Sequence, residues 1–384
     1  MKQSKFLLSG GGTGGHIFPA ISIADELCKN FSSPEILFVG SSQRMEMQKI
    51  PENGYKIKGL WISGIKRKIH LSNLLIPIKV IFSLIKSFLI INKFKPDFVI
   101  GTGGFASGPL LYVASKLNIP TLIQEQNSYP GLTNRILSQT VDTICVAYSN
   151  MDQYFPKNKI VLTGNPVRKE IKSFSKSKKQ SLDLFEMRSS NKTLLVLGGS
   201  LGAQKINDFI SNNIDSFKLM KIQIIWQCGK IYYDHYKKHN SNIINVQPFI
   251  KDMNSAYCAA DIIVSRSGAS VISELCIVGK PVIFIPSPNL AEDHQTKNAL
   301  FVKNKNAAEM IEEKYLEKDF FTVFRNLLEN NEHVMNLSKT IKLLEKPDAT
   351  KDIVELIDKV LRLSLIHISE PTRLLSISYA VFCL

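Results

Sequence analysis

The sequence predicts an α/β protein that contains two doubly wound parallel-sheet domains. Three observations lead to this prediction. Short apolar runs, each suited to a buried strand, alternate with longer helix-like segments almost from end to end of the chain. At 384 residues, the chain is too long for one ordinary hydrophobic core and about right for two. Glycine-rich turns follow several of the apolar runs, as they do where a parallel strand leads into a helix.

The predicted strands fall into two series, separated by a Ser- and Lys-rich stretch between Pro166 and Lys192 that indicates an exposed linker. The first series covers residues 6–8, 36–39, 98–100, 122–123, 143–146 and 160–162. The second series covers residues 193–197, 222–226, 243–246, 261–264 and 281–285. We therefore expect an N-terminal domain over residues 1–166, completed by a helix around 349–362, and a C-terminal domain over residues 167–348.

Composition narrows the classes of function. A hydrophobic content of 44% excludes wholesale disorder, and a net charge of +15 favours phosphate-bearing or anionic partners. Six cysteines without a C-x-x-C pair argue against a disulfide framework or a zinc site and suit a reducing cytosol. The first residues are not apolar enough for a secretory signal. No nucleic-acid-binding module is recognisable, so nucleic acid is not an expected partner.

Four glycine-rich loops follow predicted strands, two in each domain, and begin at Gly10, Gly101, Gly198 and Ser265. The N–H groups at the helix N-termini behind such loops suit a diphosphate, which we expect in a cleft between the domains. The first loop formally contains G-x-G-x-x-G. The second strand, however, ends at residues 39–42 without the carboxylate of a dinucleotide site, so NAD and FAD are disfavoured. A P-loop is excluded, because no Gly-Lys is followed by Ser or Thr.

Seven motifs, in order from about residue 5 to about residue 362, resemble one family closely. They are Gly-Gly-Thr-Gly-Gly-His-Ile-Phe-Pro-Ala (11–20), Gly-Gly-Phe-Ala-Ser-Gly-Pro (103–109), Glu-Gln-Asn (125–127), Gly-Asn-Pro-Val-Arg (164–168), Gly-Gly-Ser-Leu-Gly-Ala (198–203), Ser-Arg-Ser-Gly-Ala (265–269) and Asp-His-Gln-Thr-Lys-Asn-Ala (293–299). Together they are similar to the MurG family of bacterial UDP-N-acetylglucosamine:N-acetylmuramyl-(pentapeptide) pyrophosphoryl-undecaprenol N-acetylglucosamine transferases.

The resemblance implies a GT-B fold, with two Rossmann-like domains around a cleft. It implies inverting, metal-independent transfer of N-acetylglucosamine (GlcNAc) from UDP-GlcNAc to the C4 hydroxyl of the muramyl unit of lipid I, the undecaprenyl-linked acceptor. The product, lipid II, serves peptidoglycan and cell-wall biosynthesis, and with them cell shape and division. The implied partners are UDP-GlcNAc, lipid I, an anionic membrane surface at the cytoplasmic face of the cell membrane and a cell-wall synthesis complex, with no cofactor. Same-fold alternatives are a diacylglycerol glycosyltransferase and a UDP-GlcNAc 2-epimerase.

The resemblance also assigns a donor site, held by the C-terminal domain and completed by the N-terminal one. The implied UDP-GlcNAc-binding residues are Thr13, Gly14, Gly15, Asn127, Arg168, Ser200, Ile250, Ala269, Ser270, Val271, Ile272, Ser273, Glu274 and Gln295. Ser200 would face the diphosphate, Ile250 would offer backbone groups to the uracil, and Gln295 would contact the sugar hydroxyls. Glu274 would accept hydrogen bonds from the ribose; the alternative is an ordinary first-turn glutamate that stabilises the helix dipole.

Two residues are candidates for the general base that this reaction needs near the acceptor hydroxyl. His16 lies just after the first glycine loop, at the positive end of a predicted helix, where a neutral imidazole can accept a proton. The alternative for His16 is a positioning role, through a hydrogen bond to backbone or phosphate. Glu125 is the second candidate. Many family members carry His-Glu-Gln-Asn where this chain begins the motif with Gln124, so a role for that histidine is not transferred.

No metal site is expected. No D-x-D-like pair lies in a loop to hold a divalent ion. His235 and His239 have i,i+4 spacing, but no Glu follows the first of them and two lysines lie between. His294 lies in the last of the seven motifs. Two roles remain as alternatives for it, a contact with the sugar and an ordinary position on a helix surface.

Residues 74–91 are strongly apolar but contain Pro77, Lys79 and Lys86, which makes a membrane-spanning helix unfavourable. Seven basic and no acidic residues lie between 62 and 95, including the cluster at 66–68. This pattern favours an amphipathic segment that docks on anionic lipid; the alternative is an ordinary packed helix with its Leu and Ile toward the sheet. Residues 364–384 extend beyond the family's last helix and look like translated adapter sequence, so we expect this tail to be an artefact.

Overall fold

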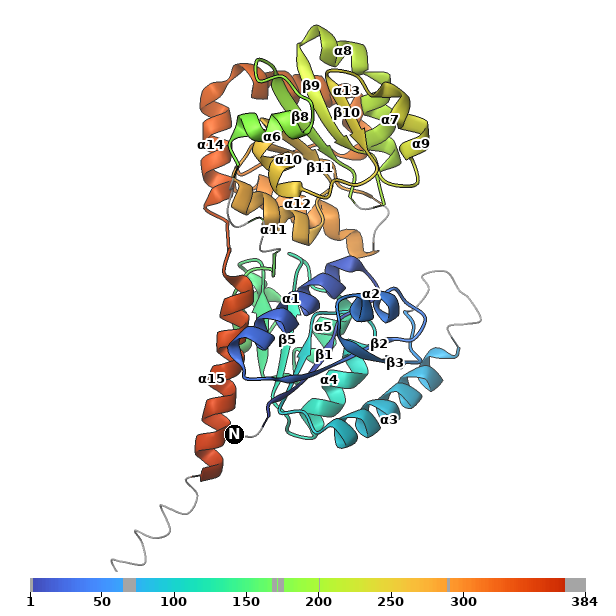
Figure 1. Ribbon diagram of the computed structural model, residues 1–384. Helices are drawn as coiled ribbons and strands as arrows, with labels where there is room; N and C mark the ends of the chain where they lie inside the picture. Colours follow the sequence, from blue (N-terminus) through green and yellow to red (C-terminus); the bar gives the residue numbers. More distant parts are fainter. Residues whose placement is uncertain are drawn as a thin grey trace, which may run out of the picture. The chain divides into compact units, whose positions relative to one another are not determined.

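The computed structural model describes residues 3–64, 74–167, 171, 176–199, 201–288 and 291–369. The chain divides into two compact units (Figure 1). Unit 1 consists of Met1–Gln126, Pro130–Pro166 and Asp348–Leu384, and unit 2 of Asn127–Tyr129 and Val167–Pro347. Each unit contains one parallel sheet with helices on it, so the predicted α/β class with two parallel-sheet domains is confirmed.

Unit 1 contains a seven-stranded parallel sheet of order β3-β2-β1-β4-β5-β6-β7. The strands are β1 (Lys5–Ser9), β2 (Glu35–Ser41), β3 (Lys56–Leu60), β4 (Phe98–Gly101), β5 (Thr121–Glu125), β6 (Thr143–Val146) and β7 (Ile160–Leu162). In the central strand β1, Ser9 pairs with Val39 on one side and with Gly101 on the other. The loops that follow β1 and β4 therefore begin side by side, at the carboxyl edge of the sheet.

Six α-helices lie in the part of unit 1 that the structure describes. They are α1 (Gly14–Asn30), α2 (Glu46–Glu52), α3 (Ile76–Phe94), α4 (Ser107–Lys116), α5 (Leu132–Leu137) and α15 (Ala349–Ser369). The last of these packs beside α1 and contributes Ile353, Val354 and Ile357 to the core (Figure 1). The backbone of residues 364–369, the start of the anomalous tail, continues α15, and residues 370–384 lie outside the described part.

Unit 2 contains a six-stranded parallel sheet of order β10-β9-β8-β11-β12-β13. Its strands are β8 (Lys192–Leu197), β9 (Ile222–Gln227), β10 (Ile244–Gln247), β11 (Ile262–Ser265), β12 (Val282–Phe284) and β13 (Glu309–Met310). Its helices are α6 (Lys178–Leu184), α7 (Gln204–Asn212), α8 (Ile214–Leu219), α9 (Tyr233–Tyr236), α10 (Met253–Ala259), α11 (Ala269–Val278), α12 (His294–Lys303), α13 (Leu316–Glu329) and α14 (Asn331–Lys342). Separate apolar clusters cover the two faces of the sheet.

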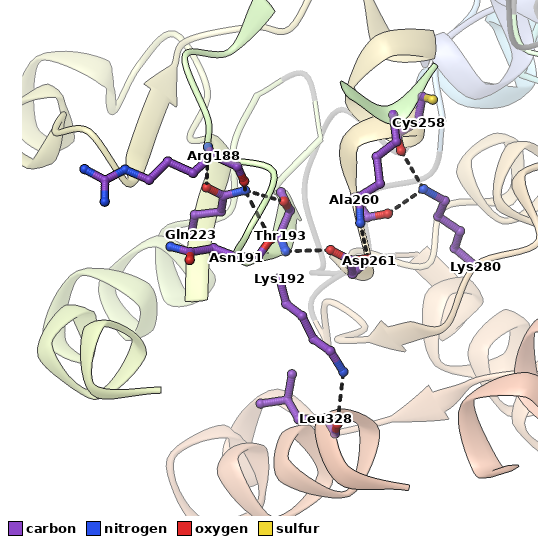
Figure 2. Close-up of polar contacts among 11 residues, drawn as sticks. Arg188, Asn191, Lys192, Thr193, Gln223, Cys258, Ala260, Asp261, Lys280 and Leu328 are labelled. Carbon is purple, nitrogen blue, oxygen red and sulfur yellow. Dashed lines mark hydrogen bonds and ion pairs between the residues drawn. The ribbon is translucent and has the colours of Figure 1, made fainter. Parts of the chain in front are cut away.

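Side chains join the amino ends of the unit 2 strands (Figure 2). The Asp261 carboxylate accepts a hydrogen bond from the Thr193 backbone N–H at 2.8 Å, just before β11 and at the start of β8. The Gln223 amide donates to the Thr193 hydroxyl, and the partly buried Lys280 ammonium donates to the carbonyl oxygens of Cys258 and Ala260. Because these carbonyls end α10, Lys280 caps that helix; its burial lowers the pKa of the ammonium to about 8.

Helix α3 of unit 1 differs from an ordinary packed helix, because many of its large apolar side chains are exposed to solvent. The buried positions of α3 include the small residues Ser83 and Ser87. Large apolar side chains are buried only toward its C-terminal end, at Ile90, Ile91 and Phe94. Seven others are exposed, namely Ile78, Val80, Ile81, Phe82, Ile85, Phe88 and Leu89. The alternative of an ordinary packed helix, with Leu and Ile toward the sheet, therefore holds at Ile90 and Ile91 and is wrong at Ile78, Ile81, Ile85 and Leu89. Nowhere in the described ranges does a helix combine the length and apolarity needed to span a membrane.

Candidate functional site

The two glycine loops of unit 1 lie against each other with no side chains between their backbones. The Gly11 N–H donates to the carbonyl oxygen of Gly103 at 3.2 Å. A Cβ on Gly104 would stand 2.4 Å from the carbonyl oxygen of Gly11, and the φ of Gly104 is +93°. Any side chain at this position would therefore push the loops apart. This close approach explains why both loops are rich in glycine.

A buried carboxylate anchors the first loop. Glu46, the first residue of α2, is fully buried, and it accepts hydrogen bonds from the backbone N–H groups of Gly12 at 3.0 Å and Ser41 at 2.9 Å. The end of β2 therefore does have a carboxylate, supplied from five residues further along the chain. Both of its carboxylate oxygens accept from backbone N–H groups. Glu46 therefore differs from the carboxylate of a dinucleotide site, whose oxygens accept from ribose hydroxyls. No local pattern in the sequence marks Glu46 as a residue of the site.

Glu46→Gln is expected to lower the free energy of unfolding by about 1–3 kcal/mol, because the amide cannot accept from both N–H groups and one of them is left buried without a partner. The matched control is Glu52→Gln at the other end of α2, where the carboxylate is exposed. That change should leave the urea midpoint where it is. Equal midpoints for the two variants, measured by circular dichroism, would contradict the anchoring role.

His16 lies in the first turn of α1, directly against the second glycine loop. Its Nδ1 is 2.8 Å from the carbonyl oxygen of Thr102 and 2.9 Å from Oε1 of Gln126. A Cβ on Gly103 would stand 2.7 Å from this Nδ1, so the imidazole occupies the space that the missing side chain leaves. The His16 side chain is only half-buried. The Nδ1 edge of the imidazole is thus held by the protein, and Nε2 is the ring nitrogen away from that contact.

Glu125, the second candidate base, has a different environment. It ends β5, is 1% exposed, and accepts hydrogen bonds from the Gly131 N–H at 3.1 Å and the Asn134 side-chain amide at 2.8 Å. Both donors belong to the start of α5. These contacts suit a carboxylate that holds the β5–α5 connection. A general base must instead reach a proton of the substrate, and the buried Glu125 carboxylate is hydrogen-bonded to the protein.

Thr13, Gly14 and Gly15 form the entry to α1. Thr13 is the N-cap residue, its side chain is exposed and makes no capping bond, and its carbonyl oxygen accepts from the N–H groups of His16 and Ile17. The first-turn N–H groups of a helix have no acceptor inside the helix, which makes this end of α1 suited to an anion or a hydroxyl oxygen.

In unit 2, the glycine loop after β8 resembles the loops of unit 1 in its close backbone packing. A Cβ on Gly202 would stand 2.2 Å from the carbonyl oxygen of Cys228, and Gly199 and Gly202 both have a φ of +82°. Ser200 and Arg168, which the family resemblance assigned to the nucleotide, lie outside the described residues.

Gln227 connects this loop to Ile250. Its Nε2 donates to the Gly199 carbonyl at 3.1 Å, and its Oε1 accepts from the Ile250 N–H at 2.9 Å. Ile250 was expected to offer backbone groups to a uracil. Because its N–H is committed to Gln227, the carbonyl oxygen is the Ile250 group that a uracil N–H could use.

The N-terminus of α11 collects most of the remaining expected residues. Ser270 and Val271 lie in its first turn and are partly exposed. The Ile272 N–H already bonds to the Gly268 carbonyl at 3.0 Å and its side chain is buried, so Ile272 has no donor for a ligand. Ser273 donates to the Ala269 carbonyl at 3.1 Å.

Glu274 and Gln295 are each oriented by neighbouring groups. Glu274 is 5% exposed, lies beyond the first turn of α11, and its Oε2 accepts from the Tyr257 hydroxyl at 3.0 Å. It is therefore not the ordinary first-turn glutamate of the alternative reading. The Gln295 carbonyl oxygen accepts from Ser267 at 2.8 Å and its Oε1 accepts from the Ser287 N–H at 2.9 Å. The structure thus brings Gln295 beside the N-terminus of α11.

Asn127 belongs to unit 2 although it follows β5 of unit 1 in sequence. Its Oδ1 accepts from the fully buried Asn298 of α12 at 3.1 Å, and the Oδ1 of Asn298 accepts from the Ser128 N–H at 2.8 Å. The same helix carries Gln295. His294 is 6.3 Å from Tyr129, measured between ring centroids.

The chain matches two family models, the glycosyltransferase family 28 N-terminal domain over residues 6–146 and the C-terminal domain over residues 193–353. A relative from Flavobacterium psychrophilum is 56% identical over 364 residues, which cover 94% of this chain and 98% of the relative. It is named UDP-N-acetylglucosamine--N-acetylmuramyl-(pentapeptide) pyrophosphoryl-undecaprenol N-acetylglucosamine transferase. A relative of the same name from Christiangramia forsetii is 52% identical, covering 94% of this chain and 99% of the relative.

A solved structure agrees with these relatives. The crystal structure of Acinetobacter baumannii MurG has a TM-score of 0.76 to this chain at 28% identity, and the match covers 93% of this chain and 100% of that one. The chain therefore belongs to glycosyltransferase family 28 and, within it, to the UDP-N-acetylglucosamine--N-acetylmuramyl-(pentapeptide) pyrophosphoryl-undecaprenol N-acetylglucosamine transferases.

Proposed function

We propose that this enzyme transfers GlcNAc from UDP-GlcNAc to the C4 hydroxyl of the muramyl unit of lipid I, with inversion at the anomeric carbon, and so forms lipid II. The observation that carries the proposal is the 56% identity, over 94% of the chain, to a relative named for this transfer. The alternatives, a diacylglycerol glycosyltransferase and a UDP-GlcNAc 2-epimerase, are not favoured, because the relatives that are 56% and 52% identical both bear the transferase name.

The donor half of the reaction rests on unit 2. The first turn of α11 presents the N–H groups of Ser270 and Val271 at the positive end of a helix dipole. Such groups stabilise the negative charge that develops on departing UDP. Glu274, oriented by Tyr257, supplies an acceptor for ribose hydroxyls, and Gln295 lies next to the same helix end. Arg168 and Ser200 remain part of this proposed site on the strength of their motifs.

The acceptor half rests on His16. Its Nε2 takes the proton of the C4 hydroxyl while that oxygen bonds to the anomeric carbon of GlcNAc. The bond from the anomeric carbon to the β-phosphate oxygen breaks on the opposite side, and UDP leaves with the electron pair. We give Glu125 the role of holding the β5–α5 connection, because its buried carboxylate accepts from Gly131 and Asn134. The helix N-termini supply the positive potential, so the proposed transfer needs no metal ion.

The test of the function is transfer of labelled GlcNAc from UDP-GlcNAc to a lipid I analogue, with EDTA present. We expect chelator-resistant formation of glycolipid. Release of UDP without glycolipid would keep the donor site and overturn the acceptor. Product that appears only after Mg²⁺ is restored would overturn metal independence, and failure to bind UDP-GlcNAc would overturn the whole proposal.

We further propose that the enzyme is peripheral, at the cytoplasmic face of the cell membrane, where it docks through α3 and joins other cell-wall enzymes. A lipid-linked acceptor requires access to the membrane surface. The exposed side chains of α3 are apolar over most of its length, with Ile81 57% and Leu89 60% exposed. Lys86 and Lys93 on the same helix are exposed, and no acidic residue lies between 62 and 95. Apolar side chains flanked by basic ones are typical of segments that bind anionic lipid.

The double variant Ile81→Ser, Ile85→Ser is expected to weaken binding to phosphatidylglycerol vesicles at least about tenfold, because two apolar side chains no longer enter the lipid. The matched control is Leu219→Ser, Leu343→Ser in unit 2, whose side chains are 86% and 75% exposed. Vesicle sedimentation at low and high salt measures the effect. Equal binding by the α3 variant and the wild type would exclude α3 as the docking surface.

A further inference from the structure

Three buried amide side chains form a continuous hydrogen-bonded chain that ends on His16. The Asn165 side chain accepts from Nε2 of Gln124 at 2.8 Å, and Oε1 of Gln124 accepts from Nε2 of Gln126. Oε1 of Gln126 in turn faces Nδ1 of His16 at 2.9 Å. Asn165, Gln124 and Gln126 are all at most 2% exposed. All four residues belong to unit 1.

The orientation of the Gln126 amide follows from its surroundings. Its nitrogen has three oxygen acceptors, the Thr102 carbonyl at 2.7 Å, the Gln124 carbonyl at 3.2 Å and Oε1 of Gln124. If the amide were flipped, its oxygen would face these three oxygens in a buried place, which costs at least one unmade hydrogen bond. Oε1 of Gln126 is therefore the atom that faces His16.

The tautomer of His16 follows in turn. Nδ1 of His16 lies between two acceptors, Oε1 of Gln126 and the carbonyl oxygen of Thr102 at 2.8 Å. Only a protonated Nδ1 can donate to either of them. A neutral imidazole held this way carries its lone pair on Nε2, and Nε2 is the nitrogen that the proposed mechanism requires as proton acceptor.

We infer that Gln126 and Gln124 are positioning residues that hold His16 in the Nδ1–H tautomer, with Gln124 and Asn165 fixing the direction of the Gln126 amide. The inference rests on the proposed function for the value of this tautomer, but the tautomer itself is a property of the free enzyme. It also gives Gln124 a role. This chain carries Gln124 where many family members carry histidine, and here its fully buried side chain supplies the acceptor that orients Gln126.

The test is nitrogen NMR of the full chain labelled with ¹⁵N-histidine, recorded at a pH where histidine is neutral. The chain has seven histidines, and the signals of His16 are the pair of nitrogen signals that is lost from the spectrum of His16→Ala. We expect His16 in the wild type to show the Nδ1–H pattern. In Gln126→Met and Gln124→Met we expect a mixture of the two tautomers. An Nε2–H pattern in the wild type, or an unchanged pattern in both variants, would overturn the inference.

Kinetics give a second readout. In Gln126→Met we expect kcat to fall in proportion to the fraction of enzyme that leaves the Nδ1–H tautomer, about twofold for an even mixture, because the wrong tautomer removes the general base. KM for UDP-GlcNAc should stay constant. The exposed Gln153→Met of unit 1 is the control and should match the wild type in both measurements. A Gln126→Met enzyme with mixed tautomers but wild-type kcat would overturn the positioning role. If lipid I is not a substrate of the wild type, the proposed function fails, and the NMR result still decides the tautomer.

Discussion

His16→Ala is expected to lower kcat for transfer to lipid I by about 10²- to 10⁴-fold, the range lost when a general base is removed. The physical reason is that the acceptor hydroxyl is a weak nucleophile until its proton is taken. Nδ1 of His16 is held 2.8 Å from the Thr102 carbonyl, which leaves Nε2 for that proton. The donor site is assigned mainly to unit 2, so binding of UDP-GlcNAc, measured by calorimetry, should stay close to that of the wild type.

Two comparisons sharpen this prediction. His235→Ala removes an exposed histidine of unit 2 and should leave kcat unchanged. Glu125→Gln tests the second candidate base. Because Glu125 is 1% exposed and accepts from the Gly131 and Asn134 donors, its loss should lower thermal stability and kcat together. The assignment of His16 would be wrong if His16→Ala kept more than about a tenth of the wild-type kcat.

The sequence predicts the strands of the two sheets except for one edge strand of each, β3 and β13. The central strands are buried on both faces, so β1 and β8 consist of continuous apolar runs that single-sequence reasoning detects. Strand β3, at an edge of its sheet, alternates Lys56, Ile57 and Lys58 and is exposed at both lysines, so no apolar run marks it. Strand β13 has two residues, too few for any periodic signal.

In the site, groups that are close together in the sequence are predictable, and groups that only the fold brings together are not. The glycine loops and His16 are visible in the sequence because the loop, the helix start and the histidine lie within a few residues of one another. Glu46 bonds to a backbone group 34 residues away, and Gln126 contacts His16 across 110 residues. The parallel pairing of β1 with β2 brings Glu46 to the first loop, and the pairing from β1 through β4 to β5 brings Gln126 to His16. No spacing in the sequence encodes these distances.

In the donor site, Glu274→Ala is expected to weaken binding of UDP by about 2–3 kcal/mol, or roughly 30- to 150-fold in Kd, because the ribose loses hydrogen bonds to a charged acceptor. Tyr257→Phe removes the hydroxyl that bonds Oε2 of Glu274 at 3.0 Å. That variant keeps the carboxylate and loses only its orientation, so its effect on Kd should be smaller. Thermal unfolding of both variants checks that each still folds.

A change in Kd alone does not show that the carboxylate meets the ribose, since a buried glutamate also supports its own helix. The 2′,3′-dideoxy analogue of UDP separates the two roles. If Glu274 accepts from the ribose hydroxyls, the wild type should bind the analogue as weakly as the alanine variant binds UDP. The alanine variant should then bind UDP and the dideoxy analogue with nearly the same Kd. If the analogue and UDP differ by the same factor in both proteins, the hydroxyls and the carboxylate are energetically independent, and Glu274 serves the fold of α11 and not the nucleotide.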